Sequence, residues 1–233
     1  RYFIQNIRSD EILSCGVIIQ GHDIFYIGAD SALSVAMHDG IYRISDYNSE
    51  KIFLLPNKVI FMSGRSHVTN DTISEFKLQI DQSLDNLISI FKKYHNSQKS
   101  CFADSSLTIC TFENGIAVSN IIESNSDFKI RETIVQPNNF KSVVCGSKNE
   151  EASKAINRYI NQGLLLDHAF INTFNDVASA EIGGTLSVYK FTVQETRLYL
   201  KTKITDPKDL KKVTVKEAAM RNPSLIRWES VFK

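Results

Sequence analysis

The sequence predicts an α+β domain in which blocks of strands are separated by helices. Short runs rich in β-branched and aromatic residues recur along the chain and are apolar at nearly every position, which is typical of strands covered on both faces. The segment 72–93 instead repeats apolar residues every three or four positions, the spacing of an amphipathic helix. Because the strands come in blocks, a layered α+β domain is favoured over a doubly wound sheet.

The first half opens with two predicted hairpins, each formed by two apolar runs that flank a turn sequence. The turns are Gly21-His22-Asp23 and Pro56-Asn57. The paired runs are 17–19 with 24–27, and 51–55 with 58–64. The segment 72–93 follows as a single helix, because Thr72-x-x-Glu75 matches a capping box and Lys92-Lys93 suits the C-terminal end of the helix dipole.

The second half again has strands followed by helices. An Asn114-Gly115 turn joins the strands of another hairpin. The expected strands are 106–112, 116–122, 128–135 and 142–146; the expected helices are 149–161 and 165–178; a last hairpin pairs 185–191 with 197–200. From Asp206 the pattern weakens into a basic tail, 206–233, with a short helix at 215–221 and the only tryptophan, Trp228.

The composition is that of an ordinary globular chain. Its 233 residues are 42% apolar and 23% charged, which is enough to bury a sizeable core. The formal net charge of +1 gives no global field toward nucleic acid or an anionic surface. No apolar run is long enough to span a membrane and no signal-peptide core is present. We therefore expect a cytoplasmic protein with neither nucleic acid nor a membrane as partner.

The cysteines and histidines indicate no metal site. The four cysteines are widely spaced, with no C-x-x-C pair, and buried reduced thiols favour a reducing compartment. The five histidines are scattered without metal-ligand spacing. We expect no metal and no cofactor.

Four short motifs occur in a fixed order. They are "GADSA" at 28–32, "EKIFLLPNKVIFMSG" at 50–64, "GSKNEEASKAI" at 146–156 and "IGGTLSVYKF" at 182–191. In order and spacing they resemble the proteasome β-subunit family and its bacterial ring-protease relatives, which are N-terminal nucleophile (Ntn) hydrolases. The resemblance implies a four-layer α-β-β-α sandwich over residues 14–205, preceded by a prefix, 1–13, that is a candidate propeptide.

The resemblance also implies a set of site residues. Ser14 lies sixteen residues before Asp30, the spacing between the family's nucleophile and its aspartate. A serine hydroxyl can attack a carbonyl while the free α-amine acts as base. The family's lysine falls on Lys51, which Asp30 would hold in place. Its oxyanion-hole glycine falls on Gly64 and its helper serine on Ser147.

Each of these residues also has a structural interpretation. Cys15 is a rival nucleophile, and Asp30 is suited to capping the turn after its strand. Lys51 also fits a lysine at a strand edge. Gly64 suits a close approach of the backbone. Ser147-x-x-Glu150 matches a capping box for the next helix.

The sequence departs from the family pattern in three places. The family has an Asp and a Ser shortly before its final Gly-Gly pair, where this chain has Ser179 and Ile182; Asp176 would substitute only with a shifted helix end. An Ntn nucleophile needs a free α-amine, so residues 1–13 would have to be removed. Leu13 stands where the family has Gly before the cut.

These departures leave two functions. In the first, the chain is a non-catalytic structural or interaction subunit of a homo-oligomer. In the second, it is a serine-type Ntn peptidase or amide hydrolase that acts on a peptide or protein once Ser14 is freed. The basic tail is interpreted as a solvated or packing arm.

Overall fold

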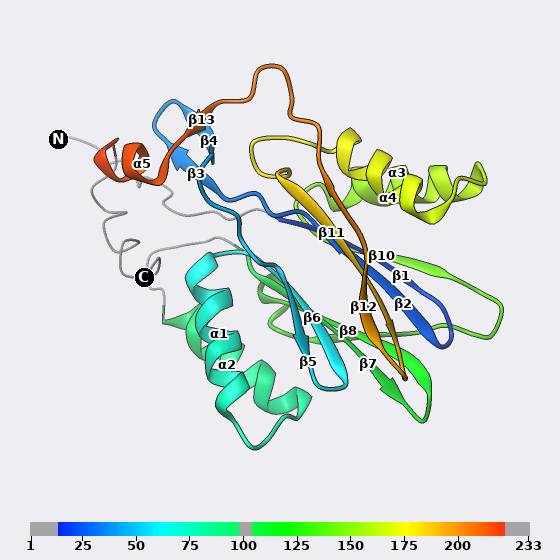
Figure 1. Cartoon of the computed structure of the whole chain (residues 1–233). Helices are drawn as coiled ribbons and strands as arrows, with labels where there is room; N and C mark the ends of the chain where they lie inside the picture. The colour runs from blue at the N-terminus through cyan, green and yellow to red at the C-terminus, as the bar shows by residue number, and fades with distance from the viewer. Residues whose placement is uncertain (1–13, 98–103, 222–233) are drawn as a thin grey trace.

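The molecule is rich in β-structure. The structure is a computed structural model that describes residues 14–97 and 104–221. Within these ranges, 38% of the residues lie in thirteen strands and 30% are helical. The strands form three sheets in which every pairing is antiparallel except one (Figure 1). The prefix 1–13, with Leu13, and also Cys101 and Trp228 lie outside the described residues.

The first sheet has five antiparallel strands and contains the predicted first and last hairpins. Its order is β10 (Lys141–Gly146), β1 (Cys15–Gln20), β2 (Ile24–Ala29), β11 (Thr185–Thr192) and β12 (Thr196–Lys203). In this order β1 is bracketed by its hairpin partner and by a strand from far along the chain. The start of β1 therefore lies beside Gly146, its register partner on β10.

The second sheet also has five antiparallel strands and follows chain order. It consists of β5 (Ile52–Leu55), β6 (Lys58–Ser63), β7 (Ser106–Glu113), β8 (Ile116–Glu123) and β9 (Ile130–Ile134). A buried apolar cluster that includes Ile18 and Phe25 from the first sheet and Phe61 from the second joins the two sheets. The predicted hairpins at the Pro56-Asn57 and Asn114-Gly115 turns are confirmed.

Two pairs of helices pack on these sheets. Helices α1 (Ser66–Leu78) and α2 (Leu84–Asn96) share a core with the second sheet. Helices α3 (Asn149–Asn161) and α4 (Leu166–Asp176) share one with the first sheet, through Phe170 and Phe174. None of the helices in the described ranges combines the length and hydropathy needed to cross a membrane.

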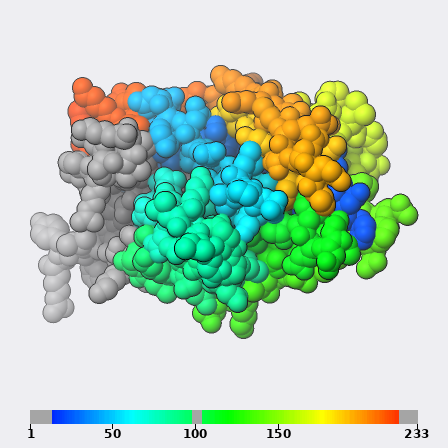
Figure 2. Space-filling view, turned by 60° about the horizontal axis from the view of Figure 1, so that its bottom comes forward, coloured from blue at the N-terminus to red at the C-terminus, as the bar shows by residue number. Residues whose placement is uncertain are grey.

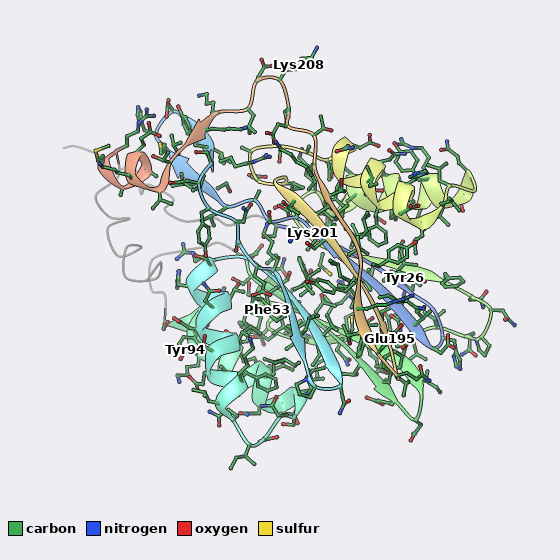
Figure 3. All side chains as sticks on the ribbon, viewed as in Figure 1. Tyr26, Phe53, Tyr94, Glu195, Lys201 and Lys208 are labelled. Carbon is green, nitrogen blue, oxygen red and sulfur yellow. The ribbon has the colours of Figure 1, made fainter. Side chains whose placement is uncertain are left out.

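A third sheet and the C-terminal segment form a separate unit at one end. Its strands are β13 (Lys212–Val213), β4 (Gly40–Ile44) and β3 (Ser34–Met37). Helix α5 (Val215–Arg221), the predicted short helix, packs on it through Ala218. In Figure 2 this helix, in red, lies beside the light-blue β3–β4 region. Figure 3 shows Lys208 at the tip of the loop that leads from β12 to this unit.

The predicted fold class is therefore corrected. The described residues form three sheets, one more than the predicted four-layer α-β-β-α sandwich contains, and strands outweigh helices. The prediction was wrong because 34–44 and 212–213 carry no long apolar run, and they form strands only by pairing with each other. The β-rich, three-sheet architecture replaces the predicted α+β class.

The single helix predicted at 72–93 is also wrong. The chain breaks between α1 and α2, so Ile80, which lies inside the predicted helix, is fully exposed. Thr72 lies inside α1 and is not its N-cap. Ser83 is the N-cap of α2, where its hydroxyl accepts a hydrogen bond from the Asn86 amide at 3.2 Å.

Candidate functional site

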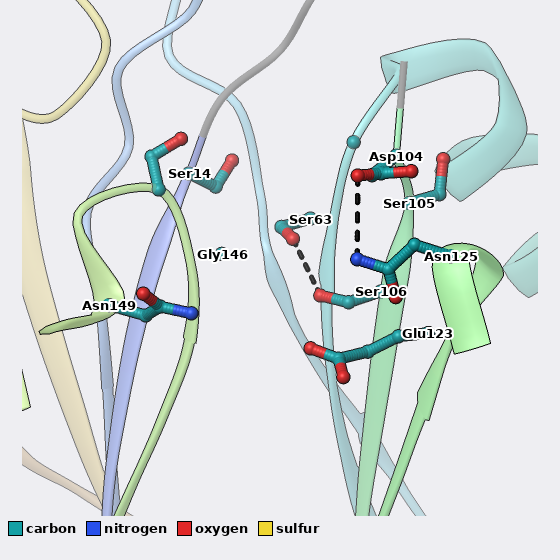
Figure 4. Close-up of a pocket in the computed structure, with 11 residues that line it drawn as sticks. Ser14, Ser63, Asp104, Ser105, Ser106, Glu123, Asn125, Gly146 and Asn149 are labelled. Carbon is teal, nitrogen blue, oxygen red and sulfur yellow. Dashed lines mark hydrogen bonds between the residues drawn. The ribbon is translucent and has the colours of Figure 1, made fainter. Parts of the chain in front are cut away.

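A polar pocket of about 250 Å³ opens between the ends of the first and second sheets (Figure 4). One wall comes from the start of β1 and the turn after β10, and carries Ser14, Gly146, Ser147 and Asn149. The other wall comes from the ends of β6, β7 and β8; it carries Ser63, Gly64, Asp104, Ser105, Ser106, Glu123 and Asn125. Three of the five predicted site residues thus line one pocket.

Ser14 is held in place by its backbone. Its carbonyl accepts a hydrogen bond from the Ser147 amide at 2.8 Å. The residue is only 1% exposed, yet its hydroxyl has no hydrogen-bond partner among the described residues. Leaving a buried hydroxyl without a partner costs free energy. The Ser14 hydroxyl is therefore free to form a hydrogen bond with a ligand bound in this pocket.

Two glycines allow the backbone around Ser14 to come this close. A Cβ on Gly146 would lie 1.9 Å from the Ser14 carbonyl oxygen, and Gly146 has a φ of +86°. Gly64 has a φ of +115°, and a Cβ there would lie within 2.9 Å of Ser105 atoms. A side chain at either position would collide with its neighbour and strain the backbone. The structural interpretation of Gly64 is therefore confirmed, and it leaves a role for its amide open.

Asp30 and Lys51 form a buried ion pair. The Lys51 ammonium donates to an Asp30 oxygen at 2.8 Å, and the two side chains are 2% and 0% exposed. The contact predicted between the two residues is thus present. Burial lowers the pKa of Lys51, and the Asp30 carboxylate partly offsets that shift.

The same carboxylate also accepts three backbone hydrogen bonds. The donors are the amides of Cys15 at 3.2 Å, Ala32 at 3.0 Å and Gly183 at 3.1 Å. The bond from Ala32 confirms that Asp30 caps the turn after β2. Asp30 therefore fixes the relative positions of three segments that are far apart in the sequence.

The five predicted residues fall into two adjacent groups. Asp30 and Lys51 line a smaller pocket of about 60 Å³, and the pocket of Ser14 does not include them. The Asp30 bond to the Cys15 amide connects the groups, since Cys15 follows Ser14 directly. The buried Ser14 hydroxyl is without a bond to Lys51.

Ser147 does not cap helix α3. The N-cap of that helix is Lys148, which has a φ of 50°, and no side chain makes the capping hydrogen bond. The predicted capping box at Ser147 is therefore wrong. Within the described residues the buried Ser147 hydroxyl has no partner either. Two unpaired hydroxyls, Ser14 and Ser147, thus line the same pocket.

Cys15 does not suit the role of nucleophile. Its side chain is fully buried and belongs to the core that β1 shares with helices α3 and α4. Burial raises the pKa of the Cys15 thiol, with a further contribution from the Asp30 charge. A thiol that stays protonated is a poor nucleophile. Cys110 and Cys145 are likewise buried and free.

The residues that depart from the family pattern supply no acid at the site. Ile182 is fully buried in the core, and the Ser179 hydroxyl accepts hydrogen bonds from the amides of Glu181 and Ile182. Asp176 pairs with Arg158 at 2.6 Å and with the Tyr159 hydroxyl at 2.7 Å. The alternative in which Asp176 replaces the missing aspartate is thus not supported.

The sequence reading missed the acidic wall of the pocket. Asp104 and Glu123 both line it, and neither was singled out. The Asn114-Gly115 turn sets a register that pairs Ser106 with Glu123. The predicted hairpin was therefore sufficient to place Glu123 opposite Ser106. Also missed was His95, whose Nδ1 lies 3.4 Å from the Ser105 hydroxyl.

The described residues contain no group of three or more His, Cys, Asp or Glu side chains placed to hold a metal ion. Comparison with protein-family models and with curated proteins finds no match to this sequence.

Proposed function

We propose that the chain is a serine-type amide hydrolase whose nucleophile is Ser14. The observation that supports this function is the Ser14 hydroxyl, which is 1% exposed, without a partner in the described structure, and part of the wall of a polar pocket. Gly64 and Ser147 lie on the same pocket, and the buried Asp30–Lys51 pair lies next to it. Buried, unpaired polar groups in a pocket are typical of functional sites.

The proposed chemistry requires a free amine on Ser14. Water adds across the Leu13–Ser14 peptide bond and leaves a carboxylate on Leu13 and an α-amine on Ser14. That amine then takes the hydroxyl proton as the oxygen attacks the substrate carbonyl. The Gly64 amide stabilises the oxyanion. The C–N bond of the substrate then breaks as its nitrogen takes the proton from the Ser14 ammonium and leaves as the amine. A second water hydrolyses the ester left on Ser14, which releases the acid and restores the hydroxyl. The Lys51 charge, held by Asp30, favours the deprotonated hydroxyl.

A second candidate is a non-catalytic subunit that assembles with copies of itself. Ile182 supports it, because a buried aliphatic side chain stands where a polar partner would be needed. Two nearly fully exposed apolar residues, Leu78 and Ile80, lie in and after the last turn of α1 and suit a contact between copies. Buried free thiols support a reducing, cytoplasmic location for either candidate.

Intact mass of the purified full chain tests the proposal. The wild type should lose residues 1–13 on incubation, and Ser14→Ala should keep them. Ser153→Ala, at a half-buried position of α3 that is not among the residues lining the pocket, is the matched control and should be processed like the wild type. A hydroxyl-directed covalent inhibitor should then label the wild type on Ser14 and leave Ser14→Ala unlabelled.

The opposite result selects the second candidate. A full-length mass that persists through long incubation, together with no labelling, would overturn the hydrolase. Light scattering at high micromolar concentration should then find an oligomer; a monomer would reject the assembly.

A further inference from the structure

The pocket wall that faces Ser14 carries two carboxylates. Asp104 precedes β7 and Glu123 ends β8, and both line the pocket opposite Ser14 and Gly146 (Figure 4). The other described lining residues are five serines, two asparagines and two glycines, so none of the described residues that line the pocket is a lysine or an arginine. The described lining therefore has a formal charge of −2 and no apolar side chain.

The two carboxylates keep most of their capacity to accept hydrogen bonds. Asp104 accepts from the Asn125 amide group at a long 3.4 Å. Glu123 pairs with Arg131 at 3.4 Å, but the Arg131 side chain is 63% exposed, and solvent screens such a pair. An ionised carboxylate offers about four acceptor positions. A cation in the pocket would therefore meet acceptors that the described residues do not already occupy.

Two basic residues, His95 and Arg65, lie near this wall without being among the described residues that line the pocket. His95 bonds Ser105 on the same wall, but burial and the nearby Arg65 charge lower the pKa of His95. The Asp104 charge opposes this shift, and the net lowering favours the neutral imidazole. Arg65 is buried and is not among the lining residues.

We propose that this pocket binds the ammonium or guanidinium group of a basic side chain in the substrate. The volume of about 250 Å³ equals roughly eight waters at about 30 Å³ each, which is room for a lysine or arginine side chain. The Ser14 hydroxyl on the facing wall is almost fully buried and has no hydrogen-bond partner among the described residues. This is independent evidence that the pocket binds a ligand. Cleavage next to the basic residue rests on the proposed function, whereas binding of the cation does not.

Binding is measured on the full chain carrying Ser14→Ala, so that no turnover is needed. The probes are Nα-acetyl-lysine N-methylamide and its neutral counterpart Nα-acetyl-norleucine N-methylamide, followed by calorimetry or NMR titration. The lysine probe should bind about tenfold more tightly, since hydrogen bonds to charged groups outweigh neutral ones. Adding Asp104→Asn and Glu123→Gln should remove this preference.

The matched control is Glu132→Gln, the same change at an exposed position on the neighbouring strand β9; it should keep the preference. Equal affinities for the two probes, or a preference that survives loss of both carboxylates, would overturn the proposal. Saturable binding of Ca²⁺ at these carboxylates with no lysine preference would also overturn it, in favour of an inorganic cation. A lysine preference in Ser14→Ala, together with a wild-type chain that keeps residues 1–13 on incubation, would uphold the cation site and reject the hydrolase.

Discussion

Asp30 is the residue on which the geometry of the candidate site depends. Its carboxylate bonds the Lys51 ammonium and the amides of Cys15, Ala32 and Gly183. These donors come from the start of β1, the turn after β2 and the segment before β11. A buried charge is tolerated when its hydrogen-bonding positions are filled. The motif "GADSA" therefore has a structural role that is needed whether or not Ser14 reacts.

Removing Lys51 from this arrangement should destabilise the fold strongly. In Lys51→Met the Asp30 carboxylate stays buried with backbone donors alone, and breaking a buried pair in this way costs about 3–5 kcal/mol. We expect the free energy of unfolding, from urea denaturation, to fall by that amount. The double variant Asp30→Asn/Lys51→Met should recover part of the loss, because it leaves no buried charge.

The control for this measurement is Lys154→Met. Lys154 pairs with Glu150 at 3.9 Å, and both side chains are at least 80% exposed, so its removal should change stability by less than about 0.5 kcal/mol. If Lys51→Met cost as little as Lys154→Met, the pair would not be buried as described.

Part of the site was predictable at this scale and part was not. The spacing between Ser14 and Asp30 and the strand order placed Asp30 beside the start of β1, because adjacent strands fix the register. Asp104 and Glu123 were missed because they lie at strand ends, and they meet Ser14 only through the packing of one sheet on another. No local pattern encodes that contact.

At the scale of elements, the break between α1 and α2 shows how a helical period can mislead. Apolar spacing continues through Ile80, yet the segment between the helices forms side-chain bonds that favour a turn. The Asp81 carboxylate accepts from the Ser83 amide at 2.9 Å, and the Ser83 hydroxyl accepts from the Asn86 amide. The side chains of Asp and Ser compete in this way with the backbone hydrogen bonds of a helix. The Asp81-Gln82-Ser83 segment thus separates the end of α1 from the start of α2 without glycine or proline.

Ser83→Ala tests that explanation. Loss of an N-cap hydroxyl typically costs about 1 kcal/mol, so the free energy of unfolding should fall by about that amount. The control is Ser66→Ala at the first residue of α1, where the N-cap is Arg65 and no side chain caps the helix; it should change stability by less than about 0.5 kcal/mol. Equal effects at the two serines would contradict a capping role for Ser83.

The third sheet could not be derived from its own residues. Strand β13 has two residues and pairs in parallel with β4, whereas β3 and β4 have four and five residues. Their pairing depends on Val213 and Ala218 closing a small core with Leu33 and Val35. This cluster joins residues that lie about 180 positions apart, so no local hydrophobic periodicity in the sequence predicts it.

At the scale of the whole molecule, Arg43 joins this third sheet to the rest. Its guanidinium, on β4, bonds the Asp206 carboxylate and the carbonyls of Ser179, Ala180 and Ile182. Gly183 makes room for it, because a Cβ there would lie within 2.4 Å of guanidinium atoms. The Gly183 amide in turn donates to Asp30. One side chain thus connects the C-terminal segment, the third sheet and the site.

Arg43→Met should uncouple these parts. The change leaves the carbonyls of Ser179 and Ala180 without this donor, whereas Asp206 keeps Lys212 at 2.8 Å. An unsatisfied buried acceptor costs about 1–3 kcal/mol, so the free energy of unfolding should fall by at least that amount. Amide hydrogen exchange should rise at 179–183 and 204–213 more than in the second sheet, because local opening follows the lost contacts. Arg43→Lys, which keeps the charge but loses the planar fork, should show stability and exchange rates between those of Arg43→Met and the wild type.

The control is Arg197→Met, since Arg197 pairs with Glu195 at 3.2 Å on an exposed hairpin and its loss should leave stability nearly unchanged. Exchange that rose evenly over all three sheets would show that Arg43 stabilises the molecule as a whole and does not connect separable parts.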